Sequence, residues 1–161
     1  MPSPTQLIDD YLAAPSILRK AIGGMNADQL KAKPVAGKWS TLEVVCHLTD
    51  FDLIYADRMK RVAAEDHPEI WGADQERYAA KLAYDQRDVA EELALLEQTR
   101  KHMARILRML PAEAFGRTAT HREPDKSEPR TLETYLTLMI EHIPHHVKFI
   151  YEKRRALGLK D

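Results

Sequence analysis

The 161-residue sequence lacks several features that would indicate particular classes of protein. Its only cysteine, Cys46, cannot form a disulfide within the chain, which favours a reducing compartment over a disulfide-rich secreted fold. No apolar run approaches the roughly 20 residues that a membrane span requires. Residues 1–6 also lack the basic and apolar regions of a secretory signal. We therefore expect a cytoplasmic protein that does not interact with membranes.

An excess of charge of one sign is absent as well. The chain has 24 Lys and Arg residues against 25 Asp and Glu residues, a formal net charge of −1. A balanced chain produces no overall field to attract nucleic acid, so no nucleic-acid partner is expected. The apolar content of 44% and the charged content of 30% are ordinary for a globular protein. The length predicts one domain over residues 1–161 with a sizeable core.

Strand signals are nearly absent, because no stretch alternates apolar and polar residues over a convincing length. Apolar residues instead recur at helical spacing, which predicts long helices over residues 5–22, 40–64, 85–110 and 131–157 and a short one over 26–31. Residues 65–85 are predicted to form an irregular crossover, which could include a short helix over the end of the bundle, and the polar, proline-broken residues 116–130 a loop. Four long amphipathic helices predict an all-α four-helix bundle.

Two prolines fall inside predicted helices. Pro15 predicts a kink or a restart of the first helix, because proline lacks an amide and crowds the preceding turn. Pro144 lies in the last helix between His142 and His146, where an interior proline costs about 3 kcal/mol. It therefore places local strain next to the most conspicuous histidines of the chain.

Three histidines are spaced as a metal site would require. His142 and His146 are four residues apart, so both imidazoles project from one face of the last helix. His47 lies in the middle of the apolar stripe of the helix over residues 40–64. If the two helices pack together, three imidazoles can hold a divalent ion, zinc or nickel above all, with coordination positions left open.

Other interpretations of these histidines remain open at this point. A histidine on an apolar stripe is usually a core residue with one hydrogen bond. His145 could replace His146 in the pair with His142, or it could face a neighbouring helix or orient a ligand. No catalytic residue is assigned, and the candidates for the surrounding pocket are Asp50, His121, Tyr135 and His145. Because ligand histidines must be neutral, metal affinity is expected to fall as the pH drops through about 6.5.

Two segments carry a family resemblance. Residues 38–50 contain Trp39-Ser40, Glu43, His47-Leu48 and Asp50 at the spacing found at the start of the second helix in the DinB-like (DinB/YfiT) superfamily. Thr131-Leu132, followed by His142 and His146, is similar to the fourth-helix segment of that family, and His121 to a histidine often found before it. The resemblance implies a bundle with its helices in up-down-down-up order, often dimeric, with a metal held by His47, His142 and His146.

The resemblance also implies a function, but several chemistries are compatible with it. The family contains metal-dependent hydrolases and thiol S-transferases, so we expect an enzyme that activates a low-molecular-weight thiol or water towards a small-molecule substrate. The alternative is a non-catalytic helical dimer that binds a metal and a ligand as a sensor or for sequestration. In either case the protein is expected to form a homodimer.

Overall fold

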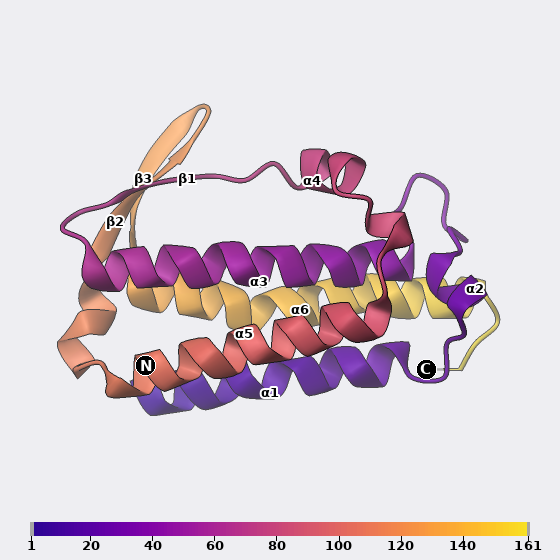
Figure 1. The fold of residues 1–161 in the computed structure, drawn as a ribbon, viewed down its shortest axis with the longest axis horizontal. Helices are drawn as coiled ribbons and strands as arrows, with labels where there is room; N and C mark the ends of the chain where they lie inside the picture. The colour runs from indigo at the N-terminus through magenta and orange to yellow at the C-terminus, as the bar shows by residue number, and fades with distance from the viewer. Residues whose placement is uncertain (1, 161) are drawn as a thin grey trace.

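The computed structural model describes residues 2–160, and four long helices dominate it (Figure 1). These are α1 (Pro4–Ile22), α3 (Thr41–Ala64), α5 (Val89–Met109) and α6 (Leu132–Ala156). The shorter elements are α2 (Ala27–Lys31), α4 (Gln75–Lys81), the 3₁₀ helices η1 (Tyr84–Gln86) and η2 (Ala112–Gly116), and the strands β1 (Glu69–Trp71), β2 (Thr118–Glu123) and β3 (Lys126–Thr131). The predicted four-helix bundle is confirmed.

The helices follow the expected up-down-down-up order. In Figure 1, α1 and α6 run in one direction and α3 and α5 in the other. Each long helix packs against two others: α1 against α5 and α6, and α3 against the same two. Because α3 and α5 are parallel, the chain must return along the whole bundle between them, and it does so through β1, α4 and η1.

Local hydrogen bonds fix where the two histidine-bearing helices begin. Ser40 Oγ accepts from the Glu43 amide at 3.1 Å, and the Glu43 carboxylate accepts from the Ser40 amide at 2.6 Å, so the predicted capping box starts α3. Thr131 caps α6 by accepting from the Thr134 amide at 3.0 Å. Both α1 and α6 continue through their internal prolines, so the predicted restart of α1 at Pro15 does not occur.

The prediction of a loop over residues 116–130 is wrong. Strand β2 pairs antiparallel with β3 and parallel with β1, giving a three-stranded sheet in the order β1-β2-β3 at one end of the bundle (Figure 1). Pro129 is tolerated because β3 is an edge strand, where a missing amide removes no internal ladder bond. The crossover over residues 65–85 contains one short helix, α4, and also strand β1, which the sequence did not predict.

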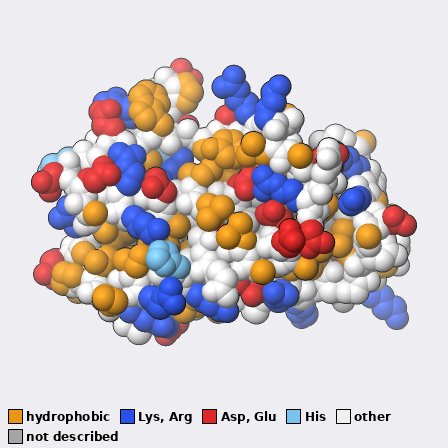
Figure 2. Space-filling model, viewed as in Figure 1, with side chains coloured by type: hydrophobic (Ala, Val, Ile, Leu, Met, Phe, Trp, Pro, Cys, Tyr) orange, Lys and Arg blue, Asp and Glu red, His pale blue; other side chains and the backbone are white. Residues whose placement is uncertain are grey.

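Two hydrophobic clusters fill the bundle along its length. One lies towards the sheet and includes Tyr11, Met59, Leu107, Tyr135 and Met139; the other includes Leu18, Val45, Leu48, Leu96 and Ile143. On the face shown in Figure 2, positive and negative side chains are intermingled with hydrophobic ones, as the balanced composition predicts. No helix within residues 2–160 combines the length and the apolar character needed to span a bilayer.

Candidate metal centre

The structure brings His47 of α3 together with His142 and His146 of α6. The Nε2 atom of His47 lies 3.1 Å from Nε2 of His142 and 3.2 Å from Nε2 of His146. These are the distances expected when nitrogens share one ion, because two ligands about 2.05 Å from a tetrahedral zinc are about 3.3 Å apart. Within residues 2–160, these three histidines form a group of potential metal ligands, and their donor atoms all lie within 4.8 Å of one another.

Burial keeps these imidazoles in the form that binds metals. Desolvation, together with a smaller effect of the neighbouring histidines, lowers the pKa of His47 to about 3 and that of His142 to about 2. The pKa of His146 is lowered to about 4 by burial and by the charges of His145 and Lys153. The rings are therefore neutral at physiological pH, and in the folded protein protons compete for them only at lower pH than an ordinary histidine pKa predicts.

Packing against aromatic rings, without a hydrogen bond at Nδ1, orients the central ring. The His47 ring lies 5.1 Å from the Trp39 ring and 4.4 Å from the Phe51 ring, measured between centroids, and the side chain is 1% exposed. The Nδ1 atoms of His47 and His142 are buried and have no hydrogen-bond partner within residues 2–160. With Nδ1 unpaired and Nε2 turned inward, each ring directs its metal-binding atom to the common point. The residues present therefore fit a divalent ion.

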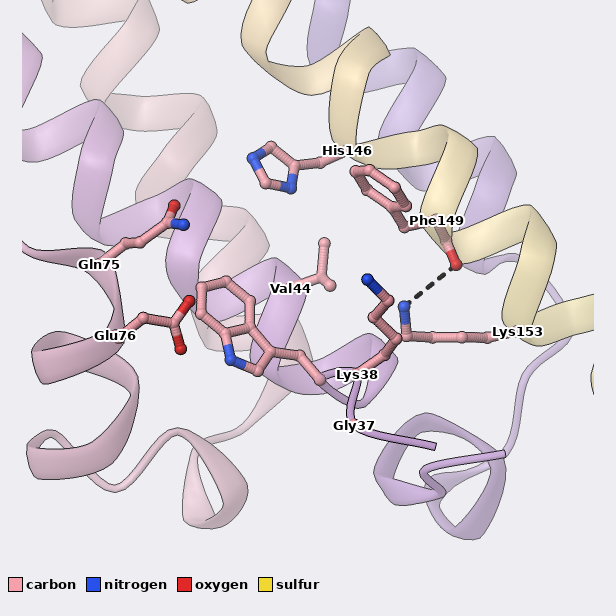
Figure 3. A pocket seen from close by; sticks show the side chains of 9 residues that line it. Gly37, Lys38, Val44, Gln75, Glu76, His146, Phe149 and Lys153 are labelled. Carbon is pink, nitrogen blue, oxygen red and sulfur yellow. Dashed lines mark hydrogen bonds between the residues drawn. The ribbon is translucent and has the colours of Figure 1, made fainter. Parts of the chain in front are cut away.

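A pocket of about 230 Å³ gives access to this centre from the side of His146 (Figure 3). Trp39 and Phe149 provide apolar walls, and Gln75 and Glu76 of α4 lie across the pocket from Phe149. Lys38 and Lys153 also line it. His47 is almost fully buried, whereas His146 lines this pocket, so a substrate in the pocket would meet the centre at His146.

The structure does not bring the candidate Asp50 into the group. Its carboxylate accepts from Arg87 Nη1 at 2.8 Å and from the Tyr84 hydroxyl at 2.9 Å. These contacts tie α3 to the end of the crossover. Asp50 therefore serves the connection between α3 and α5 rather than the pocket beside His146.

His121 and Tyr135, two further candidates, pair with each other. The Tyr135 hydroxyl lies 2.9 Å from His121 Nδ1, and Glu123 Oε1 lies 3.0 Å from His121 Nε2. Both His121 and Tyr135 are almost fully buried. This arrangement joins β2 to α6, and neither residue lines the pocket beside His146.

His145 is exposed and lies beside the centre. Its ring packs against those of His146 and Phe149, with centroid separations of 5.1 and 5.4 Å. The donor atoms that converge with His47 belong to His142 and His146, so the geometry favours this pair over His142 with His145. His145 is placed to support the His146 ring from outside.

The sequence interpretation did not identify the two lysines of the pocket. Lys153 lies near the basic end of α6, yet it is 2% exposed and lines the pocket. A signal for this was present: Lys153 follows Ile150 by three residues and His146 by seven, so it lies on the inner face of α6.

The comparisons with known proteins agree with this geometry. The model of the DinB superfamily matches residues 11–150. YfiT of Bacillus subtilis, named as a candidate metal-dependent hydrolase, is 31% identical over 144 residues, which cover 89% of this chain and 80% of YfiT. A relative from Bacillus licheniformis with the same description is 28% identical over 151 residues, covering 94% of this chain and 85% of the relative.

Solved structures show the same architecture. The structure of Bacillus subtilis YfiT, described as having an unusual four-helix bundle topology, superposes with a TM-score of 0.88 at 29% identity, covering 98% of this chain and 89% of YfiT. A DinB-like protein of the same species, YjoA, shares the fold with a TM-score of 0.62 at 18% identity, covering 97% and 94% of the two chains. Given the family match over most of its length, the chain belongs to the DinB superfamily.

Proposed function

We propose that the protein is a metal-dependent enzyme in which His47, His142 and His146 hold a divalent cation, zinc or nickel, next to a substrate pocket. The observation that carries this proposal is the convergence of three neutral imidazoles beside an open pocket: Nε2 of His47 lies 3.1 and 3.2 Å from Nε2 of His142 and His146, and all three donor atoms lie within 4.8 Å of one another. Such a cation lowers the pKa of a coordinated water or thiol and thereby supplies a nucleophile at neutral pH.

The chain's own residues would prepare the site for this chemistry. Burial holds the imidazoles neutral, so no proton has to leave a ring before a cation binds. Trp39 and Phe51 pack around His47 and exclude water from the inner side of the centre. His146 lines this pocket, which provides a small-molecule substrate with a path to the centre.

Hydrolysis of a small molecule is the first candidate reaction, and the description of the relatives as candidate metal-dependent hydrolases supports it. A water nucleophile usually needs a group that accepts its proton. Glu76 lines the pocket, and its carboxylate could accept this proton. Thiol transfer is the second candidate, because a thiolate that binds the cation as an anion is itself the nucleophile.

Metal analysis followed by two activity panels tests the proposal. Purified protein saturated with zinc or nickel should retain one equivalent of metal after gel filtration. It should then either hydrolyse small esters and amides or conjugate a low-molecular-weight thiol to an electrophile. Retained metal with no turnover in either panel would favour the non-catalytic binding alternative. Failure to retain either metal would refute the proposed centre.

A further inference from the structure

Two lysines of the pocket beside His146, Lys38 and Lys153, form no ion pair within residues 2–160. The Lys153 side chain is 2% exposed, and its ammonium donates to the Phe149 carbonyl at 3.1 Å. Within residues 2–160, no carboxylate oxygen lies within 4.0 Å of the ammonium of Lys153 or of Lys38. A buried ammonium with a single neutral acceptor is unusual, because removing a charge from water is costly unless an opposite charge compensates.

The two ammonium groups lie on the same side of the pocket. Figure 3 shows the nitrogen atoms of Lys38, from the segment before α3, and Lys153, from α6, close to each other between Val44 and Phe149. Burial lowers the pKa of Lys153; Lys38 also lowers it, as a neighbouring like charge does, whereas the carboxylates of Glu152 and Glu43 act in the opposite direction. Since neither ammonium forms an ion pair with a carboxylate within residues 2–160, an anionic group between the two would complete the arrangement.

The contact of Lys153 with its own helix explains only part of this arrangement. A lysine in the last turn of a helix interacts favourably with the free carbonyl groups there, and the bond to Phe149 is of this kind. That contact occupies one of three ammonium hydrogens. It does not account for Lys38, which reaches the same place from a different segment.

We propose that this pocket binds a small molecule through a carboxylate or similar oxyanion held between Lys38 and Lys153. The rest of the molecule would lie against Trp39 and Phe149, with its reactive end directed to His146. A volume of about 230 Å³ lies below the range of about 300–1,000 Å³ typical of pockets for drug-sized ligands, so the ligand is small. The proposal rests on the proposed function, because it names the substrate class of the same centre.

The two tryptophans allow a direct test that does not depend on turnover. Trp39 lines this pocket, whereas Trp71 lines a separate groove beside β1 and serves as an internal control. Succinate, titrated into ¹⁵N-labelled protein, should shift the indole N–H resonance of Trp39 and leave that of Trp71 in place. The uncharged analogue succinamide should shift neither resonance. The titration is made with zinc-saturated protein and repeated after dialysis against EDTA.

Lysine variants test whether Lys38 and Lys153 bind the carboxylate of succinate. Lys153→Met and Lys38→Met should each weaken succinate binding at least 10-fold, whereas Lys148→Met, an exposed lysine of α6, should leave it unchanged. Lys38 is exposed, so its variant keeps the test valid if Lys153→Met does not fold. Equal binding of succinate and succinamide, equal shifts of both indoles, or unchanged affinity in a folded lysine variant would overturn the proposal.

The same experiments separate this inference from the proposed metal centre. Retention of zinc without selective succinate binding would refute the anion site and leave the metal centre standing. Selective succinate binding in protein that retains no metal would refute the metal centre and leave the anion site. Zinc-saturated protein should also bind 3-mercaptopropionate more tightly than 3-mercaptopropionamide, and Lys153→Met should abolish this difference. Persistence of the difference in Lys153→Met would contradict the role of Lys153.

Discussion

The guanidinium of Arg100 and the carboxylate of Asp52 form a fully buried ion pair at the centre of the bundle. Arg100 Nε lies 3.0 Å from Asp52 Oδ1, and both side chains have zero exposure. The two remaining nitrogens donate to the backbone carbonyls of Tyr11 at 2.8 Å and Met139 at 2.9 Å. One side chain thus joins α5 to α1, α3 and α6. Since Met139 precedes His142 by three residues, the same contacts hold the histidine-bearing part of α6 in place.

Replacing Arg100 by Met should destabilise the protein by about 3–5 kcal/mol, because it leaves the buried carboxylate of Asp52 without a partner. Urea unfolding followed by circular dichroism measures this change. Arg108→Met is the matched control on the same helix: Arg108 is half-exposed and pairs with Asp9, and an ion pair at the surface contributes about 0–1 kcal/mol. Equal losses in the two variants would contradict a special role for the buried pair.

This ion pair shows what periodicity could have predicted about the core. Arg100 lies four residues after Leu96 and three before Met103, on the apolar stripe of its helix. A charged residue at such a position signals a buried partner. The identity of that partner was not predictable, because Asp52 is 48 residues away and meets Arg100 only once the helices pack.

The helices and the histidine cluster were predictable because both depend on local spacing. His142 and His146 share a face whatever the tertiary structure, and the position of His47 on an apolar stripe already directed it to the core. The hairpin was missed because the inward residues of β2 are Ala119 and His121, which carry little strand signal. Strand β2 also pairs with β1 in parallel, and this pairing joins segments about 50 residues apart in the chain, which no local sequence pattern reveals.

Loss of one of the three histidines should remove the metal. Loss of a residue that only orients a metal ligand typically lowers metal affinity about 10- to 100-fold. Because His47 is proposed as a ligand itself, we expect His47→Asn to lower zinc affinity by more than this. His145→Asn should retain one equivalent of zinc, because its ring lies outside the converging group. Competition titration with a chromogenic chelator measures both affinities. Similar affinities for the two variants would show that the metal, if bound, lies elsewhere.

The stability of the metal-free protein should depend on pH through the same histidines. An unfolded histidine binds a proton near pH 6.5, whereas the pKa is about 3 for His47, 2 for His142 and 4 for His146 in the folded chain. Between pH 6.5 and 4 the unfolded chain therefore takes up protons that the folded chain does not. The free energy of unfolding should accordingly fall as the pH decreases, by up to about 1.4 kcal/mol per unit for each histidine.

The His142→Asn variant separates this effect from the titration of carboxylates. Urea unfolding of both proteins after dialysis against EDTA, at several values between pH 7.5 and 4.5, should give a shallower dependence for the variant. The pKa of His142 is lowered the most of the three, so its removal should have a clear effect. Identical slopes for the two proteins would mean that His142 is protonated as readily in the folded state as in the unfolded one.

The contact between Tyr135 and His121 should contribute to stability and not to metal binding. In Tyr135→Phe, the buried Nδ1 of His121 loses its partner at 2.9 Å, which should cost about 1–3 kcal/mol. Tyr55→Phe is the matched control, because the Tyr55 ring packs 5.9 Å from that of Tyr135 and the same hydroxyl group is removed without changing the contact with His121. Thermal unfolding and zinc titration of both variants test this. A drop in zinc affinity in Tyr135→Phe alone would contradict this prediction. It would show that the contact at the sheet end of the bundle affects metal binding, through the face of α6 on which Tyr135 and His142 lie seven residues apart.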